Sequence, residues 1–443
     1  MPYLLVGRGG NYMTGTETTA TTIAGTKRWP RRYTMVALCF GAVFVCYIDR
    51  VNISVAVLAM QEEFGWSETV KGFVLSSFFI GYMLFMAPAG WIANRIGGRI
   101  VLGLAVLWWS IMTIFTPAAV FLSLPILILA RIAMGLGEAA MFPSAYSIFS
   151  RWVPPSERSR AVALLLSGIP LGTLFALTTS GWIVSTYGWP SVFYIFGALG
   201  FVWTALWFFQ AHDDPADDPR ISHDERALLE EFAVPEGEKP PIPWRKIFSS
   251  KAVWALLINH FCSNWVFYML LAWLPSYFRG QLGLSITSAG LYSAAPWMTM
   301  FIVGNLSGWI ADGMVKRGLS LTAVRKIMQT IGLVGSAIFM LLASGVDTAG
   351  IAVLYMCGAL GMAAFTWSGF VPNHLDIAPR YADVLMGITN TAGTVPGIIG
   401  VIITGWLVDT TGTFAAAFML GAAINIVGAI VWLLFATGER VID

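Results

Sequence analysis

Four charged residues lie inside long apolar segments of the 443-residue chain: Asp49, Arg50, Arg131 and Glu138. A charge at the centre of a bilayer costs at least about 2.5 to 3.5 kcal/mol on insertion scales, so such residues face a protein interior or a water path. Arginines can bind an anion there, and carboxyl groups can take up a proton. The four residues are therefore candidates for transport chemistry.

The spacing of these charges limits which of them can pair. Arg131 and Glu138 are seven residues apart, which places both on one helix face with about 10.5 Å of rise between them. They are too far apart for a simple helical ion pair. Asp49 and Arg50 are neighbours and point about 100° apart, so they need not pair with each other either.

The composition indicates a polytopic membrane protein. Apolar residues make up 57% of the chain and charged residues 11%, against roughly 45 to 50% and 25% in a soluble domain. This excludes a soluble enzyme, and a net charge of +2 leaves no surplus for nucleic acid. Apolar runs long enough to span a bilayer number twelve: 33–60, 69–93, 99–117, 124–150, 159–186, 190–210, 251–278, 286–313, 324–344, 349–373, 382–408 and 413–437.

Hydrophilic segments divide these runs into two groups of six. We expect a disordered tail at 1–32, a six-helix bundle at 33–210, a linker at 211–250, a second bundle at 251–437 and a short tail at 438–443. Of the 26 Lys and Arg residues, 22 fall on the side of the linker and both termini. By the positive-inside rule this side is cytoplasmic.

The two groups also share sequence patterns at a nearly constant offset. GWIANRIGGR at 90–99 recurs as GWIADGMVKRG at 308–318, and GWIVSTYGW at 181–189 recurs as GWLVDTTGT at 405–413. Such internal repeats are typical of transporters built from two related halves. Arg131 and Glu138 correspond to Tyr355 and Met362 in the second half, so the buried charge is confined to the first. This asymmetry favours coupling chemistry over a scaffold role shared by both halves.

The repeated loop resembles the signature of the major facilitator superfamily, G-x-x-x-D-R-x-G-R-R. Asn94 stands where the signature has Asp, whereas the second half has Asp312. The resemblance implies a fold of twelve transmembrane helices in two pseudo-symmetric six-helix bundles, an all-α membrane protein. It also implies that the matching loop residues act in gating: Gly90, Asn94, Arg95, Arg99, Asp312 and Arg317.

Three further segments resemble the anion:cation symporter branch of that superfamily: YIDRVNISVA at 47–56, ARIAMGLGEAAMFPS at 130–144 and RWVPPSERSRAVAL at 151–164. This branch includes bacterial galactonate, glucarate and hexuronate permeases, the animal sialin and the vesicular glutamate carriers. The resemblance implies an organic-anion transporter that is commonly coupled to protons.

The four buried charges then take separate roles in the hypothesis. Arg50 binds the substrate carboxylate, Asp49 and Glu138 accept protons, and Arg131 modulates them. An acid that loses its arginine to the substrate takes up a proton, so anion and proton bind cooperatively, as symport requires. The alternative is a structural network in which two acids and two bases neutralise each other and fix helix packing.

Resemblance to the sugar-acid permeases also suggests partners for substrate hydroxyl groups. These are Tyr47 and Tyr82 in the first half and Asn264, Ser368 and Asn390 in the second. For each of them, hydrogen bonding between helices is an equally good interpretation. The four cysteines, Cys39, Cys46, Cys262 and Cys357, lie in apolar stretches and are interpreted as reduced core residues.

The leading functional prediction is proton-coupled uptake of a sugar acid (a hexonate, hexuronate or aldarate) by alternating access, without an enzymatic activity. No GxSxG, P-loop or HExxH motif occurs. An aromatic carboxylate is the second candidate, favoured by apolar Ile169 and Pro170; a non-transporting sensor or an exporter fits less well. We expect no cofactor besides the coupling proton, no metal and no nucleic acid. The expected setting is a monomer in the lipid bilayer of the bacterial inner membrane, with both termini cytoplasmic.

Overall fold

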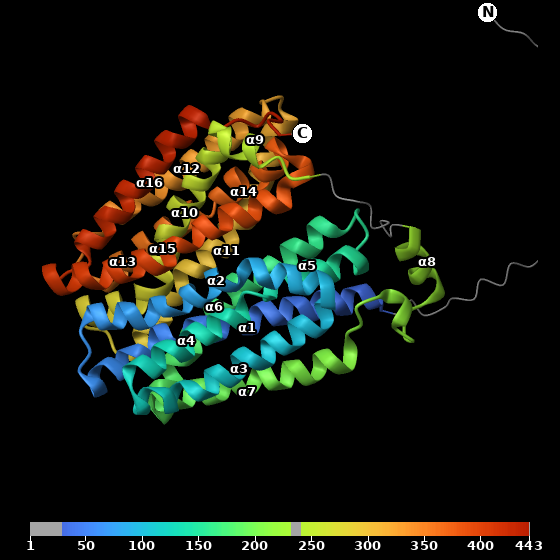
Figure 1. The fold of residues 1–443 in the computed structure, drawn as a ribbon. Coiled ribbons are helices and arrows are strands. Elements are labelled where there is room, and N and C mark those ends of the chain that lie inside the picture. The colour runs from blue at the N-terminus through green and yellow to red at the C-terminus, as the bar shows by residue number, and fades with distance from the viewer. Residues whose placement is uncertain (1–28, 232–240, 443) are drawn as a thin grey trace, which may run out of the picture.

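A computed structural model describes residues 29–231 and 241–442, and within these ranges the chain is helical without strands (Figure 1). Twelve helical segments are long and apolar enough to cross a membrane, which confirms the predicted number. In the first half these are α1 (Arg31–Phe64), α2 (Glu68–Ile96), α3 (Gly98–Leu122), α4 (Leu124–Glu138) with α5 (Met141–Trp152), α6 (Arg158–Tyr187) and α7 (Trp189–Gln210). In the second half they are α10 (Lys251–Ser276) with η2 (Tyr277–Gln281), α11 (Ile286–Lys316), α12 (Leu321–Ala343), α13 (Ala349–Ala363) with α14 (Thr366–Ile377), η3 (Pro379–Tyr381) with α15 (Ala382–Thr411), and α16 (Ala415–Phe435).

In the described part of the segment between the halves, the elements are short: η1 (Pro215–Asp217), α8 (His223–Glu231) and α9 (Trp244–Ser249). Parts of the segments predicted as tails and linker lie outside the described residues, namely 1–28, 232–240 and 443.

One transmembrane segment in each half is interrupted at a corresponding place. The fourth segment turns at residues 139–140, between α4 and α5, and the tenth turns at 364–365, between α13 and α14. The first break directly follows Glu138, the last residue of α4. The internal repeat seen in the sequence therefore extends to an irregularity of the helices, and in the first half this irregularity adjoins a candidate proton acceptor.

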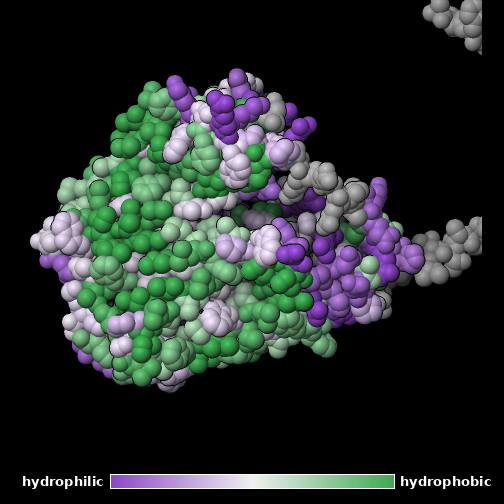
Figure 2. All heavy atoms as spheres, in the orientation of Figure 1, coloured by the Kyte–Doolittle hydropathy of each residue, from purple (hydrophilic) through white to green (hydrophobic). Residues whose placement is uncertain are grey.

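The two bundles lie close together at the end away from α8 and diverge towards α8 (Figure 1). Contacts between the halves run along α2 with α15 and α6 with α11. Glycines permit the close approach: a side chain on Gly405 of α15 would collide with the Glu68 carbonyl, and one on Gly290 of α11 would collide with the Leu177 carbonyl. On the face shown in Figure 2, apolar side chains cover both bundles, while hydrophilic ones gather around α8 and around α9, as expected for a bilayer-embedded body.

Candidate anion and proton site

The centre of the first half contains a buried ion pair between α1 and α4. Both Nε and Nη2 of Arg50 donate to Oε2 of Glu138, at 2.9 and 2.8 Å. The side chains are 3% and 0% exposed, so both partners are removed from solvent. The other carboxylate oxygen, Oε1, has no hydrogen-bond partner. The pair joins residues that are 88 positions apart in the sequence. The roles predicted for Arg50 and Glu138 did not include an ion pair between them.

Three aromatic rings surround the Arg50 guanidinium. Its Cζ lies 4.7 Å from the ring centre of Tyr47, 4.8 Å from that of Phe78 and 4.9 Å from that of Tyr82. Arg50 Nη1 also donates to the Tyr47 hydroxyl at 3.4 Å. The structure thus brings both predicted first-half tyrosines to the predicted substrate arginine. Such cation–π contacts stabilise a guanidinium that is withdrawn from water.

Asp49 and Arg131 are buried on neighbouring helices without a direct ion pair. Neither carboxylate oxygen of Asp49 has a hydrogen-bond partner, and the residue is fully buried. Arg131 donates from Nη1 to the Met134 sulfur at 3.0 Å and lies over the Phe78 ring at 5.5 Å, while its Nε has no partner. Two opposite charges are therefore present in one bundle interior without being joined.

The predicted second-half residues contact helices rather than one another. Asn264 donates to the Gly393 carbonyl at 2.8 Å, and the hydroxyl of Ser368 bonds that of Ser307 at 2.8 Å. Asn390 reaches across the halves and donates to the Met86 sulfur at 3.0 Å. The structure does not bring these three side chains together, and each is engaged in a contact between helices.

The predicted gating residues occupy the linker-side ends of α2, α3 and α11. Gly90, Asn94 and Arg95 end α2, where the Arg95 guanidinium lies 5.0 Å from the ring of Trp91. Asp312 and Arg317 are exposed near the end of α11.

Asp213 supplies an acid to the loop in which Asn94 replaces the signature Asp. Its Oδ1 accepts a hydrogen bond from the Arg99 backbone at 2.8 Å, and Arg99 Nη2 donates to the Phe208 carbonyl at 3.0 Å. Sequence reasoning missed Asp213 because it lies outside the repeated loop, after α7.

Contacts at the opposite end close the halves on each other. The Asp409 carboxylate of α15 accepts hydrogen bonds from the backbone N–H groups of Glu68 and Thr69, at 2.9 and 2.7 Å, and from the Thr69 hydroxyl. Lys71, only 1% exposed, contacts Glu68 at 2.5 Å and lies 5.1 Å from the ring of Trp273 in α10. Residues of the second half thereby bind the first turn of α2. A carboxylate at a helix N-terminus is favourable because it meets unpaired N–H groups and the positive end of the dipole.

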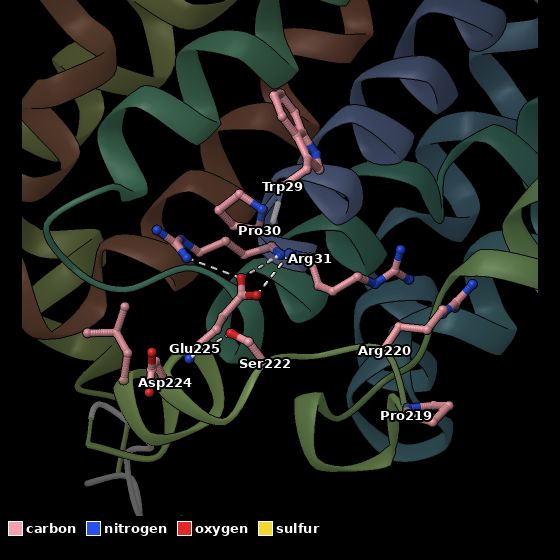
Figure 3. A pocket seen from close by; sticks show the side chains of 10 residues that line it. Trp29, Pro30, Arg31, Pro219, Arg220, Ser222, Asp224 and Glu225 are labelled. Carbon is pink, nitrogen blue, oxygen red and sulfur yellow. Dashed lines mark hydrogen bonds and ion pairs between the residues drawn. The ribbon is translucent and has the colours of Figure 1, made fainter. Parts of the chain in front are cut away.

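A second polar cluster ties the start of α8 to the start of α1 (Figure 3). The Glu225 carboxylate accepts from the backbone N–H groups of Arg31 and Arg32, at 2.9 and 3.0 Å. Asp218, fully buried, bonds Arg31 at 2.8 Å and Arg220 at 3.1 Å. Burial raises the pKa of Asp218, but hydrogen bonds from Arg220 and Arg31 outweigh it, so the pKa lies below its usual value. A pocket of about 650 Å³ adjoins this cluster, but the carboxylates already engage its arginines.

Three residues at the central site carried no functional prediction. Cys46, interpreted as a core residue, also donates its thiol to Glu138 Oε2 at 3.0 Å; its position one turn before Arg50 was an available signal. Phe78 and Met134 contact the arginines, yet nothing distinguishes them in sequence from other apolar residues of membrane helices.

Two six-helix bundles related by an internal repeat, with buried charge inside the first bundle and contacts between the bundles along α2 with α15 and α6 with α11, form the architecture of a secondary transporter. The family model for the major facilitator superfamily matches residues 39–401. The chain belongs to this superfamily.

Several curated relatives carry the names of anion transporters. An ascorbate transporter and a sodium-dependent phosphate transport protein 1, both chloroplastic and from Arabidopsis thaliana, are each 45% identical over 417 residues. These alignments cover 94% of this chain and 77% and 81% of those proteins. Human sialin is 36% identical over 444 residues, covering 92% of this chain and 90% of sialin. This chain is thus shown to be an anion transporter of the superfamily, and its relatives are not enzymes.

A solved structure has the same fold. The inward-facing, occupied structure of a bacterial homologue of the human lysosomal transporter Spinster aligns with a TM-score of 0.72 at 18% identity, over 92% of this chain and 97% of that one. The expectation of a bacterial inner membrane gains no support from the comparisons, because the plant relatives named above are chloroplastic. The chain is a multi-pass membrane protein with twelve spans.

Proposed function

We propose that this chain is a proton-coupled symporter that takes up a small organic anion, with a sugar acid as the leading substrate. The observation that carries the proposal is the buried Arg50–Glu138 ion pair, in which one carboxylate oxygen takes both arginine hydrogen bonds and the other has none. A substrate carboxylate offers Arg50 the same chemistry as Glu138. The two acids therefore compete for one guanidinium.

The competition links substrate to proton. When the substrate engages Arg50, Glu138 loses its counter-charge in a site that excludes water, and a buried carboxylate without a partner is most stable when it carries a proton. Anion and proton then bind together, and by linkage each strengthens the other. In this proposal Asp49 is a second proton acceptor and Arg131 modulates both acids.

The arrangement of the halves suggests where the exchange takes place. The halves are closed by Asp409 and Lys71 at one end and diverge towards α8, so in this proposal substrate and proton enter from the linker side, which the charge distribution predicts to be cytoplasmic. The gating loops, the monomeric state, protons as the only coupling ion and the bacterial inner membrane remain parts of the proposal. The chloroplastic relatives leave that location unsupported.

The relatives support an anion but differ in which one. The likeness to an ascorbate transporter favours an organic acid bearing hydroxyl groups, whereas the likeness to a sodium-dependent phosphate transport protein keeps inorganic phosphate and a sodium gradient as arms of the test. An aromatic carboxylate is a second candidate. The three rings around Arg50 favour it, because they offer a stacking surface beside the guanidinium.

A ligand screen followed by a flux assay tests the proposal. Thermal unfolding of the purified protein is measured at two pH values with sugar acids, aromatic acids, phosphate and neutral sugars, since bound ligand stabilises by RT ln(1 + [L]/Kd). We expect a carboxylate to stabilise the wild type but not Arg50→Lys, and the same carboxylate to accumulate in proteoliposomes under an inward proton gradient. Stabilisation by neutral compounds alone, or accumulation driven only by sodium, would contradict it.

A further inference from the structure

Among the described residues, Phe78 is the one aromatic side chain over which both buried guanidinium groups of the first-half site, those of Arg50 and Arg131, lie. The Cζ of Arg50 is 4.8 Å from its ring centre and that of Arg131 is 5.5 Å. Phe78 itself is fully buried, and the two arginines are 5% and 2% exposed. Two like charges in a low-dielectric interior repel each other. The negative face of a shared ring offsets part of that repulsion.

The two arginines depend on this ring to different degrees. Arg50 also has the Glu138 carboxylate and the rings of Tyr47 and Tyr82. Arg131 has the Met134 sulfur and no ion-pair partner within 4 Å among the described residues. The charged groups that face Arg131 are Glu138 of its own helix and Arg50 and Asp49 of α1. Among the described residues, Phe78 is therefore the ring that supports Arg131, in addition to the attraction of the Glu138 and Asp49 carboxylates.

The backbone fixes where the ring sits. A side chain on Gly135 of α4 would collide with the Phe78 carbonyl, and one on Gly81 of α2 would collide with the Ile132 carbonyl. α2 and α4 thus touch through their backbones on either side of this residue. Such close contact leaves little freedom for the ring to shift while the two helices stay together.

Phe78 also touches a chain of rings that leads to the second half. It makes an edge contact with Phe79, with ring centres 5.2 Å apart. Phe79 in turn lies 4.5 Å from Tyr268 of α10 and directly against Gly397 of α15. A movement of the second half past Phe79 would therefore act on the ring that holds both arginines.

We infer that Phe78 is a positioning residue that couples the substrate arginine to the proton-site arginine through the one aromatic ring that both guanidinium groups contact. The inference rests on the proposed function. It adds that the link between Arg50 and Arg131 is the electrostatic character of one ring rather than its volume. If that support weakens, Arg131 turns towards Asp49, whose ionised form it stabilises, and a more acidic medium is needed to load the proton.

Graded fluorination of Phe78 tests this without changing the shape of the core. Phenylalanine with one, two and three ring fluorines is incorporated at position 78, which weakens the negative face stepwise at nearly constant volume. Uptake of the carboxylate found in the ligand screen is measured in proteoliposomes as a function of substrate and pH. We expect KM to rise stepwise by roughly three- to tenfold over the series, with the midpoint of the pH profile moving to lower pH. Phe78→Leu should be at least as impaired as the trifluoro protein, and Phe78→Tyr should retain most of the wild-type KM.

The same fluorination series at Phe193 is the matched control, because this phenylalanine is 1% exposed and the described residues place no cation over its ring. It should leave KM and the pH profile unchanged. A flat series at Phe78 in a protein that transports normally would overturn this inference alone. A wild type without proton-driven anion uptake would overturn the proposed function, and this inference with it.

Discussion

The interiors of the two halves differ in the charge of their buried polar residues, although both contain polar atoms without a hydrogen-bond partner, such as Nδ1 of His260 in the second half. At the centre of the first half lie the four charged side chains of the candidate site, and several of their atoms have no hydrogen-bond partner: both oxygens of Asp49, Oε1 of Glu138 and Nε of Arg131. The second half holds a neutral network at a similar degree of burial. Gln329 donates to Asn259 at 3.1 Å and to Ser263 at 3.2 Å, and accepts from the Phe370 backbone at 3.2 Å.

We interpret this difference as that between a transport site in the first half and a structural scaffold in the second. A buried polar group without a partner is unstable unless a proton, a substrate or another conformation satisfies it at some stage of the cycle. A satisfied amide network instead fixes helix packing. Charged residues of the second half lie towards its ends, as with Asp409 at one end and the pair of Arg325 with Asp376 near the other. We expect the first half to couple the anion to the proton. We expect the second half to support the first and to open and close access to its site.

Removing the Glu138 carboxylate should produce the largest effect. Glu138→Gln keeps the shape but cannot carry a proton, and it leaves Arg50 without its counter-charge. We expect proton-driven accumulation to fall at least about 100-fold, while exchange of substrate between the two sides continues at a reduced rate. The measurement compares gradient-driven uptake with counterflow in proteoliposomes.

Met362→Gln is the control for that prediction, because it places the same amide at the corresponding position of the second half. It should leave the ratio of accumulation to exchange near the wild-type value. If Glu138→Gln still concentrated substrate at the wild-type level, the coupling role would belong elsewhere, and Asp49→Asn would be the next variant to test.

Arg50→Lys should have the next largest effect, on affinity rather than on coupling alone. A lysine ammonium cannot reproduce the planar two-bond contact that the guanidinium makes, so we expect the substrate to bind about tenfold more weakly. Binding is followed by calorimetry or by the ligand-induced thermal shift. Arg325→Lys makes the same exchange in the second half, where the guanidinium binds Asp376 at 2.7 Å, and it should leave affinity unchanged. Equal losses in both variants would remove the distinction between the halves.

Asp409→Asn should shift the balance between conformations by a smaller amount. Its carboxylate holds the first turn of α2 through two backbone N–H groups and a hydroxyl, and an amide oxygen is a weaker acceptor there. We expect the outward-open population to rise several-fold, as for a loss of about 1 kcal/mol. Spin labels at the exposed positions Tyr187 and Thr413 would report longer distances. Asp347→Asn alters an exposed acid between α12 and α13 and should leave the distance distribution as it is.

The transmembrane helices and the buried charges could be predicted from the sequence because both follow from local composition. A run of apolar residues must form a helix in lipid, and a charge inside such a run must face inwards. The Arg50–Glu138 pair could not be predicted, since it depends on how α1 packs against α4. For the same reason the sequence could not decide between substrate binding and helix contacts for Asn264 and Ser368, each of which makes a hydrogen bond between helices in the structure. From the sequence, Asp49 and Glu138 were predicted to have the same role. In the structure Glu138 pairs with Arg50, whereas the carboxylate of Asp49 has no hydrogen-bond partner.

The smallest expected effect is on the stability of the protein, through the polar cluster that links α8 to the first half. The pKa of Glu157 is lowered by hydrogen bonds from Arg32, and that of Asp218 is lowered because hydrogen bonds outweigh burial. A carboxyl whose pKa is lower in the folded state stabilises the protein above its unfolded pKa of about 4, and this stability is lost as pH falls through the folded value. We therefore expect the unfolding temperature to be insensitive to these groups from pH 8 to 5 and to drop below about pH 4.

Asp218→Asn should lower the stability at neutral pH by about 1 to 3 kcal/mol and reduce the acid-dependent drop, as measured by thermal unfolding at pH 7 and pH 3.5. Asp217→Asn, one residue earlier and exposed, should change neither. Because the cluster links η1 and α8 to first-half elements, namely α1, α7 and the turn before α6, Asp218→Asn should also leave the distance between Tyr187 and Thr413 labels unchanged. A shift in that distance would mean that the linker takes part in gating and that the two halves are less independent than their interiors suggest.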